Sequence, residues 1–396
     1  MNGKDRLRIE LRRAVQSAAK ISCLLPVRRR RILFESYEGT AYACNPKYLS
    51  EYLDSHCPGR YELLWSFAHP EDYADLPVAA VKRRSLRWFY EYLTAGVRVT
   101  NTATQMSIFP KRRGQLVINT WHAGGAYKRV SISSEHVEKA DPVDEWRRRT
   151  QGSHFDLYLS SSPRFTQTNI REGNAFAGAV LKSGMPRNDL FFRREAVEAA
   201  ASKVRERLGI EGPLILYAPT YRGKFAESAA VPPFPADALM RGYLARFGRV
   251  PVLLSRAHYT DTKDAVLSGG QEMTVVDVTS YPDMQELLCA ADLLVTDYSS
   301  SIWDYALLGR PCLLYCPDLE QYETADRGFY TPIGEWPGIL CRDGAAMEEA
   351  LRNLDEAKCA RKAAEHLRAF RSYEAGHACA MTERVIRHFV RTGELP

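Results

Sequence analysis

Short apolar runs alternate with helical patterns along the chain, and they form two consecutive series. Such runs, bounded by polar segments, are typical of the buried strands of parallel sheets. The expected strands are Ile32–Tyr37, Leu63–Phe67, Val97–Thr100, Leu116–Thr120 and Leu157–Ser160 in the first series, and Leu214–Ala218, Val250–Leu254, Thr274–Val278, Leu293–Thr296 and Cys312–Tyr315 in the second. The expected helices are Pro46–Leu53, Leu86–Leu93, Arg194–Leu208, Met284–Ala291, Ile302–Leu308 and those after Met347. The pattern predicts two doubly wound α/β domains.

The two series fit the 396 residues of the chain, because single domains usually take about 100–200 residues each. We expect four parts: a basic segment at 1–31, a first Rossmann-like domain at 32–209, a second at 210–375, and a C-terminal helix at 376–396 that crosses back to the first domain. Ligands of such sheets bind at the carboxyl ends of the strands. A cleft between the two domains is therefore the expected site.

The composition is that of a globular protein in a reducing compartment. Hydrophobic residues make up 45% and charged residues 26%, which is ordinary for soluble domains. None of the nine cysteines forms a Cys-x-x-Cys pair, so buried thiols are expected instead of a disulfide framework. The sequence shows neither a secretory signal nor an apolar run of the ~20 residues that span a bilayer. We expect a cytoplasmic protein.

The first 31 residues carry the excess positive charge. They hold ten Lys or Arg against Asp5 and Glu10, a net charge of +8, whereas the remainder holds 44 basic and 46 acidic residues. Apolar residues at alternating spacings of four and three share one face of a helix that Pro26 ends: Leu7, Leu11, Ala14, Ala18, Ile21 and Leu25. Such a helix lies on an anionic membrane, or it packs on its own domain or on a partner subunit. We expect the protein to lie on the inner face of the cell membrane, and homo-oligomerisation is left open.

A buried strand that ends in an aspartate is followed by three serines and a helix that closes at Gly309. Backbone N–H groups at a helix start, together with the positive end of the helix dipole, bind phosphate or diphosphate. An ordinary N-cap is the alternative, but three serines exceed what capping needs. The residues expected to bind phosphate are Asp297, Ser299, Ser300 and Ser301.

A second motif joins a strand to the sequence Trp-His-Ala-Gly-Gly-Ala-Tyr-Lys-Arg at 121–129. The unperturbed pKa of histidine, ~6.5, suits a general base, and His122 follows the carboxyl end of the strand. The glycines let a substrate approach the backbone, and the two cations suit phosphate. A satisfied structural histidine is the alternative. The residues expected to contact acceptor or phosphate here are Trp121, Gly124, Gly125, Lys128 and Arg129.

Other polar residues follow strands of the second series. Arg256 and His258 come after one strand, and Thr220 and Arg222 come after another. Several strands thus end in polar or cationic groups, which favours one donor-binding edge. The segment Lys182–Asp189 is typical of a turn after a strand. Three of its residues are further candidates for acceptor or phosphate contacts: Arg187, Asn188 and Asp189.

Common metal and nucleotide signatures are absent from the sequence. It has no Asp-x-Asp motif, no Gly-x-x-x-x-Gly-Lys-Ser/Thr loop and no Cys/His spacing suited to zinc. We therefore predict no metal site and no cofactor, with metal dependence left open. No nucleic-acid partner is expected.

These motifs resemble the CDP-glycerol glycerophosphotransferases of teichoic-acid and capsule biosynthesis. The matching pieces lie between about Ile32 and Tyr330, in the order of that family: Trp121-His122, Gly184–Asp189, Leu216–Thr220, Arg256–His258, Thr296–Ser300, Asp318–Tyr322 and Arg327–Tyr330. The resemblance implies a GT-B type arrangement of two Rossmann-like domains, with the donor mainly on the second.

By this resemblance, an acceptor hydroxyl attacks the alditol-side phosphorus of a CDP-alditol, and CMP leaves. His122 is then the base, His258 contacts the pyrophosphate or leaving side of the donor, and the serines hold phosphate. Such transfer rests largely on positioning and charge stabilisation. The implied acceptor is a lipid-linked saccharide or a growing polymer.

One departure concerns the loop after the base. The commoner form of the family has His-Gly-Thr followed by Pro-Leu-Lys, whereas this chain reads His-Ala-Gly-Gly-Ala-Tyr-Lys and keeps the lysine. The acceptor therefore stays open, as do CDP-ribitol as donor and single addition against polymerisation. A GT-B glycosyltransferase that uses a nucleotide sugar and a non-catalytic envelope-binding module are the competing functions.

Overall fold

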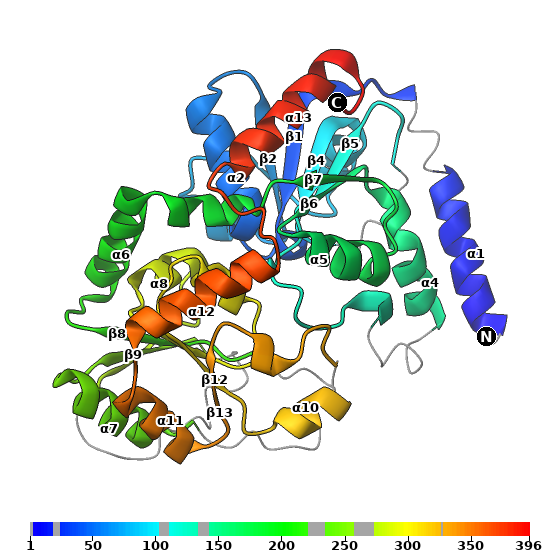
Figure 1. The fold of residues 1–396 in the computed structure, drawn as a ribbon. Helices are drawn as coiled ribbons and strands as arrows, with labels where there is room; N and C mark the ends of the chain where they lie inside the picture. Colours follow the sequence, from blue (N-terminus) through cyan, green and yellow to red (C-terminus); the bar gives the residue numbers. More distant parts are fainter. Residues whose placement is uncertain are drawn as a thin grey trace. The chain divides into compact units, whose positions relative to one another are not determined.

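The computed structural model describes residues 3–18, 24–102, 111–133, 142–220, 234–256, 273–325 and 328–396. The chain divides into two compact units (Figure 1). Unit 1 comprises Met1–His122, Val130–Asp189 and Tyr373–Pro396. Unit 2 comprises Ala123–Arg129 and Leu190–Ser372.

Unit 1 is built on a seven-stranded parallel sheet. Its strands, in spatial order, are β3 (Ala80–Lys82), β2 (Glu62–Phe67), β1 (Arg28–Glu35), β4 (Ala95–Thr100), β5 (Leu116–Asn119), β6 (Leu157–Ser160) and β7 (Ala179–Lys182). Its helices are α1 (Gly3–Ala18), α2 (Cys44–His56), α3 (Leu86–Thr94), α4 (Pro142–Thr150), α5 (Pro163–Phe165) and α13 (Ala378–Thr392). The strand order reverses between β1 and β4, which is the place where doubly wound sheets bind ligands.

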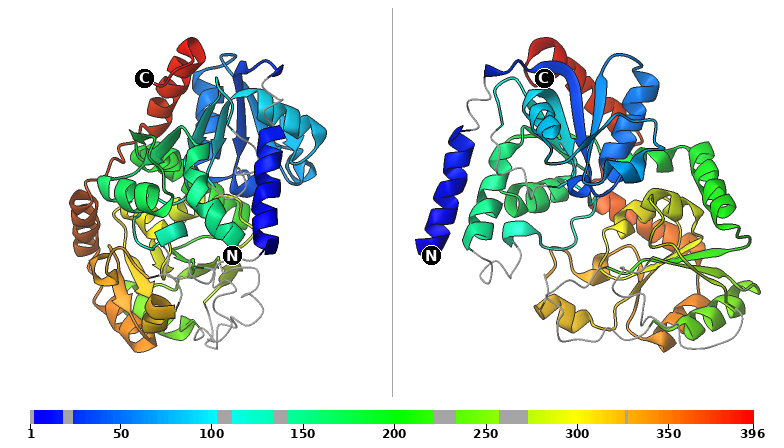
Figure 2. Two further views of the ribbon diagram at one scale, coloured as in Figure 1. Left: turned by 90° about the vertical axis from the view of Figure 1, so that its right-hand side faces the viewer. Right: turned by 180° about the vertical axis from the view of Figure 1, so that it is seen from behind.

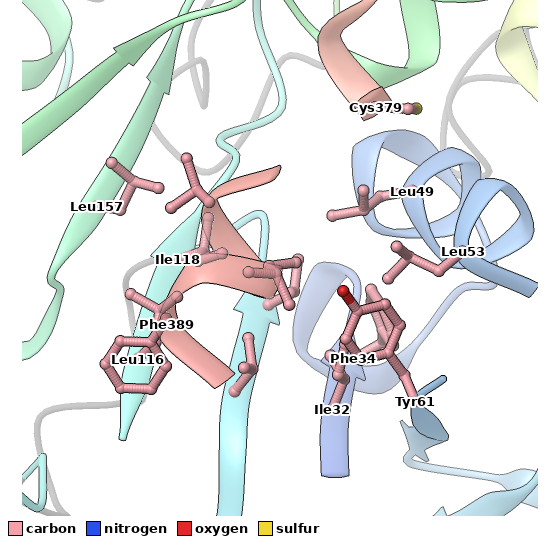
Figure 3. Close-up of a cluster of buried hydrophobic side chains, with 14 of the residues drawn as sticks. Ile32, Phe34, Leu49, Leu53, Tyr61, Leu116, Ile118, Leu157, Cys379 and Phe389 are labelled. Carbon is pink, nitrogen blue, oxygen red and sulfur yellow. The ribbon is translucent and has the colours of Figure 1, made fainter. Parts of the chain in front are cut away.

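The main core of unit 1 joins one face of this sheet to two helices (Figure 3). Ile32 and Ile118 come from the strands, Leu53 comes from α2, and Phe389 comes from α13. Each large apolar side chain buried in this way contributes about 1.5–3 kcal/mol. The C-terminal helix is therefore an integral part of unit 1, although most of unit 2 precedes it in the sequence.

Unit 2 is built on a six-stranded parallel sheet. Its strands, in spatial order, are β10 (Val275–Asp277), β9 (Val252–Ser255), β8 (Leu214–Tyr217), β11 (Leu293–Thr296), β12 (Cys312–Tyr315) and β13 (Ile339–Cys341). Its helices are α6 (Arg194–Leu208), α7 (Ala236–Phe247), α8 (Met284–Ala290), α9 (Ser301–Ala306), α10 (Leu319–Ala325), α11 (Gly344–Arg352) and α12 (Glu356–Ala369). Here the strand order reverses between β8 and β11.

Two Rossmann-like parallel sheets confirm the predicted α/β class, and all the expected strands are present. The sequence analysis missed β3, β7 and β13. All three are edge strands. Edge strands are short and partly exposed, so they lack the continuous apolar run by which buried parallel strands are found.

The boundary between the units lies at Leu190, ahead of the expected boundary at residue 210. The reason is α6, which packs against α8 in unit 2. Lys203 of α6 adds an ion pair with Glu286 of α8, with Nζ and Oε1 2.6 Å apart. Helical spacing alone does not indicate which neighbouring domain a connecting helix joins.

The arginine run at the end of the expected basic segment belongs to the sheet, because β1 begins at Arg28. Arg28 and Arg31 both pair with acids on neighbouring elements. Arg31 Nη2 lies 2.8 Å from Glu62 Oε2 of β2, and Arg28 Nη1 lies 3.1 Å from Glu91 Oε2 of α3. The expectation that the first α/β series starts after Arg31 is therefore corrected.

Helix α1 packs against α4 within unit 1 (Figure 2). Ile9 of α1 is buried, whereas Leu7 and Leu11 are 71% and 65% exposed. Leu7, Leu11 and Ala14 of the predicted apolar face thus lie on the side of α1 that the unit does not cover, and its member Ile21 lies outside the described residues. Within the described parts of the chain, no helix is long and apolar enough to cross a membrane.

Candidate active site

His122 follows the carboxyl end of β5 through a sharp change of backbone direction. Trp121 has φ +52°, in the left-handed region that residues other than glycine rarely adopt. Its N–H donates to the side-chain oxygen of Asn119 at 2.7 Å, which holds the turn. The Trp121 and His122 rings stack with centroids 4.7 Å apart. Both predicted residues therefore lie together just beyond β5, with Trp121 buried and His122 half-buried.

The proton on the His122 ring is assigned by a backbone partner. Nδ1 lies 2.9 Å from the backbone oxygen of Asn101. A carbonyl oxygen can only accept a hydrogen bond, so Nδ1 carries the proton. In the neutral ring Nε2 then carries the lone pair, which is the arrangement that a general base needs.

Asn101, which the sequence analysis missed, fixes that backbone oxygen. It directly follows β4 and is fully buried. Its side-chain oxygen accepts the Tyr37 N–H at 2.8 Å, and its Nδ2 donates to Ser36 Oγ at 3.0 Å. Asn101 thereby joins the ends of β1 and β4, where the strand order reverses. A buried polar residue directly after a buried strand was the available signal.

Arg187 supports the backbone around His122. Its Nη1 donates to the backbone oxygen of His122 at 2.8 Å, and its N–H donates to Asn45 Oδ1 at 3.1 Å. Asn45 donates through Nδ2 to the backbone oxygen of Trp121 at 2.8 Å. Arg187 is only 5% exposed, so in this structure it restrains the backbone around His122, and its contact with an acceptor or phosphate stays a prediction.

Asn188 and Asp189 also bond within unit 1. The Asn188 side chain is fully buried and donates to Glu374 Oε1 at 3.0 Å. The Asp189 carboxylate accepts the N–H groups of Ala378 and Cys379, both at 2.8 Å, at the start of α13. Burial raises the pKa of Asp189, although these backbone donors oppose that shift. Both residues therefore tie the turn after β7 to the chain around α13, and their predicted role toward an acceptor or phosphate stays a prediction.

The two glycines after His122 serve packing. A Cβ on Gly124 would lie 2.3 Å from Trp303 Cδ1, and one on Gly125 would lie 2.1 Å from the Tyr127 ring. Both glycines are buried. Protein side chains thus fill the space that a Cβ would take at either position, and the contact of these glycines with acceptor or phosphate stays a prediction.

Lys128 and Arg129 are half-buried residues of unit 2. The backbone of Lys128 forms an isolated antiparallel bridge with Phe329, and the Arg129 N–H donates to the Gly328 oxygen at 3.2 Å. These backbone contacts fix the backbone positions from which both side chains extend. Their role toward phosphate stays a prediction.

In unit 2, Asp297 connects the ends of β8 and β11. Its carboxylate accepts the Thr220 N–H at 2.7 Å and also the Tyr298 N–H. Asp297 is only 3% exposed. Asp297 therefore holds the two loops together, and its role toward phosphate stays a prediction, as does that of Thr220, which is half-buried at the same edge.

The three serines follow at the start of α9. Ser301 contacts Ser299 Oγ through both its N–H and its hydroxyl, at 3.3 and 2.9 Å. Ser300 is the N-cap residue, and its side chain makes no capping hydrogen bond. Ser299 and Ser300 are half-buried, and Ser301 is buried. Part of the motif therefore serves the helix start itself, and phosphate binding stays a prediction.

Arg256 follows β9 at the same edge of the sheet. Its N–H donates to the Tyr217 oxygen and its Nη1 donates to the Tyr281 oxygen, both at 2.8 Å. We call Ser299–Ser301 the serine motif. The structure thus brings Thr220, Arg256 and the serine motif to the carboxyl ends of three adjacent strands. His258 and Arg222 lie outside the described residues.

Comparison with known proteins identifies relatives along nearly the whole chain. Residues 17–390 match the family described as CDP-Glycerol:Poly(glycerophosphate) glycerophosphotransferase. The teichoic acid poly(glycerol phosphate) polymerase of Bacillus spizizenii is 31% identical over 348 residues, which are 86% of this chain and 87% of that protein. The polymerase of the same name from Bacillus subtilis is 31% identical over 340 residues, which cover 83% of this chain but only 44% of that protein.

A solved structure agrees with this assignment. It is a histidine-to-asparagine variant of the wall teichoic acid polymerase TagF, soaked with CDPG. It is 27% identical to this chain, with a TM-score of 0.80, and the match covers 98% of this chain and 97% of that one. The predicted GT-B-like fold and the predicted family are both confirmed. The chain belongs to the CDP-glycerol:poly(glycerophosphate) glycerophosphotransferase family.

Proposed function

We propose that the protein transfers glycerol phosphate from CDP-glycerol to a hydroxyl of a lipid-linked or growing teichoic-acid or capsular polymer, and releases CMP. The acceptor oxygen forms a bond to the glycerol-side phosphorus. The bond between that phosphorus and the bridging oxygen breaks, and CMP leaves with the electron pair. The acceptor proton passes to a base on the protein.

The observation that carries this proposal is the orientation of His122. Its Nδ1–H is committed to the Asn101 oxygen at 2.9 Å, so Nε2 is the nitrogen that takes the acceptor proton. Arg187 adds a second restraint through the His122 oxygen. Such restraint favours catalysis, because general-base transfer depends on a fixed distance and direction.

We assign the donor diphosphate to the serine motif of unit 2 and to Arg256. Backbone N–H groups and hydroxyls at Ser299–Ser301 offer hydrogen bonds to phosphate oxygens, and the guanidinium offers charge. Asp297 holds together the two loops that carry these groups, because its carboxylate accepts the Thr220 N–H. Phosphoryl transfer gains most from such positioned donors and cations.

We further propose that α1 holds the protein on an anionic membrane, where a lipid-linked acceptor is found. Leu7 and Leu11 are exposed on one face of α1, beside lysine and arginine residues of the same helix. Apolar side chains enter the lipid interface, and nearby cations attract its anionic headgroups.

A product assay with purified full-length protein tests the reaction. CDP-glycerol, CDP-ribitol and a UDP-sugar are each offered with a lipid-linked saccharide primer, and the released nucleotide is identified. CMP from CDP-glycerol, with growth of the primer by glycerol phosphate, supports the proposal. CMP from CDP-ribitol alone would make the enzyme a ribitol phosphotransferase, and UDP would make it a glycosyltransferase. No turnover with any donor favours a binding module.

A further inference from the structure

The seven residues that follow His122 belong to unit 2, whereas His122 itself is the last residue before them in unit 1. We call Ala123–Arg129 the anchor segment. Its chain returns to unit 1 at Val130. Because His122 is joined to Ala123 by a peptide bond, whatever fixes the anchor segment also restricts where the His122 backbone can be.

Tyr127 is the most buried large side chain of the anchor segment, at 1% exposed. Its ring packs among aromatic rings of unit 2, with centroids 4.5 Å from Trp336 and 6.3 Å from Phe370. Its backbone oxygen accepts the Tyr330 N–H at 2.8 Å. Side chain and backbone of Tyr127 thus both fix the segment.

The hydroxyl of Tyr127 has one well-defined partner, His366 of α12. Tyr127 Oη and His366 Nε2 are 2.9 Å apart, and His366 Nδ1 lies 2.9 Å from the Glu335 oxygen. The carbonyl can only accept, so Nδ1 carries the proton, and in the neutral ring Nε2 accepts from Tyr127. Burial raises the pKa of Tyr127 well above its usual value, so the phenol keeps its proton. Both hydrogen bonds can therefore form together, with Tyr127 donating to His366 and His366 donating to the Glu335 oxygen.

The same aromatic group reaches the serine motif. Trp336 contacts Phe329 at 5.3 Å between centroids, Phe329 contacts Tyr322 at 5.8 Å, and Tyr322 stacks on Tyr298 at 3.8 Å. Tyr298 directly precedes Ser299. Closely packed aromatic rings move little, so the anchor segment and the start of the serine motif share one stiff support within unit 2.

We propose that His366 is a positioning residue for glycerol phosphate transfer: by accepting the Tyr127 hydroxyl, it locks the anchor segment and so restricts the backbone of the base His122. The inference rests on the proposed function, in which His122 removes the acceptor proton. His366 touches neither substrate in this role. Its loss should leave donor binding intact and reduce the rate of the chemical step.

The decisive variant is Tyr127→Phe, which removes one hydroxyl and keeps the ring in its packing. We expect kcat for CMP release to fall by about 10- to 100-fold, as for other small misplacements of a catalytic group. KM for CDP-glycerol should not change, because the donor contacts are retained. Hydrogen–deuterium exchange of the peptide at 117–130 should become faster, which reports the loosened segment without relying on activity.

The matched control is Tyr61→Phe. Tyr61 is a buried tyrosine of unit 1 whose hydroxyl also donates at 2.9 Å, to Glu383 Oε1. This variant should lose stability but keep kcat and the exchange rate of peptide 117–130. Two substitutions of His366 test whether another acceptor can replace its ring nitrogen. The side-chain oxygen of His366→Gln can still accept from Tyr127, so this variant should retain more activity than His366→Leu.

The outcomes separate the inference from the function on which it rests. Wild-type protein that releases no CMP from CDP-glycerol overturns the proposed function. An active wild type with unchanged kcat in Tyr127→Phe overturns the inference alone, as does unchanged exchange at 117–130. Equal losses of kcat in Tyr127→Phe and Tyr61→Phe would mean that general destabilisation, and not positioning, explains the effect.

Discussion

The Nδ1 atom of His122 lies 2.9 Å from the backbone oxygen of Asn101, and this bond decides which ring nitrogen carries the proton in the neutral ring. The oxygen itself is held by the Asn101 side chain, which bonds to Tyr37 and Ser36 at the end of β1. Two strands and one loop thus cooperate to orient one imidazole.

Replacing His122 by alanine should lower kcat by about 10²- to 10⁴-fold, the usual effect of losing a general base. Donor affinity should change little, because His122 is assigned to the acceptor proton. The measurement is steady-state CMP release together with calorimetric titration of CDP-glycerol. His258→Ala is the companion variant and should instead weaken donor use. Near-normal rates in both variants at saturating substrate would rule out the two-histidine assignment.

Replacing Ser300 by glutamate should weaken CDP-glycerol binding by about tenfold or more, because a second negative charge would lie within a few ångströms of the diphosphate. Ser300→Gln is the matched control, since it adds the same bulk without the charge. Calorimetric titration of both variants separates the two effects. Equal affinity of the glutamate and glutamine variants would place the diphosphate elsewhere.

Gly124→Ala should destabilise the protein by about 1–3 kcal/mol, the usual cost of overpacking a core. The new Cβ would meet Trp303 Cδ1 at 2.3 Å, and Trp303 is fully buried. Gly334→Ala is the control, because a Cβ there meets no atom within 4 Å. Urea denaturation of the two variants measures the difference. A stable Gly124→Ala variant would show that the space beside Trp303 is larger than the structure indicates.

His154 should make the protein less stable as the pH falls. Burial lowers its pKa from 6.5 to about 4, and the nearby Arg98 and Lys111 add to the shift. The unfolded chain therefore binds a proton between pH 6.5 and 4 that the folded chain does not, so stability falls with pH in this window. Between pH 7 and 5 this one group should cost about 2 kcal/mol.

The test is urea denaturation at both pH values with wild-type protein and with His154→Gln, which stays neutral throughout. The loss of stability on going from pH 7 to 5 should be smaller in the variant. An identical loss in both proteins would mean that His154 is accessible enough to be protonated in the folded state.

The sequence indicated the site features that depend on a local pattern. It did not indicate those that depend on contacts between residues far apart in the chain. Trp121 and His122 follow a buried strand, and that local pattern is enough to place them at a sheet edge. The tautomer of His122 is different, because it depends on Asn101, which follows another strand. Because these two residues lie far apart in the sequence, no local pattern indicates their hydrogen bond.

The contacts of the turn after β7 also had no local signal. Arg187, Asn188 and Asp189 are polar residues in a turn, and turns usually face solvent or ligand. Here the turn is covered by Glu374 and by the start of α13, which lie far away in the sequence. Likewise, the sequence near Gly124 does not indicate its neighbour Trp303, which comes from another motif. Local pattern indicated the kind of residue, but only the fold supplied the partner.

The last prediction concerns α1, whose two faces are distinguished by single residues. Ile9 is 5% exposed on the side that packs in unit 1, whereas Leu7 and Leu11 are 71% and 65% exposed. A double substitution, Leu7→Gln with Leu11→Gln, should therefore spare the fold and weaken binding to anionic vesicles. Removal of residues 1–31 would be a poorer test, because it would also delete half of β1.

Vesicle co-sedimentation at low and high salt measures this effect. Each Lys or Arg near an anionic surface contributes roughly 1 kcal/mol, screened beyond a Debye length of about 8 Å at physiological salt. Wild-type binding should thus fall as salt rises, and the double variant should bind weakly at both salt concentrations while its melting temperature is unchanged. Ile9→Gln is the matched control, because it should lower the melting temperature through lost packing. If the double variant sediments as well as wild type, Leu7 and Leu11 do not contact lipid, and another surface must bring the enzyme to its acceptor.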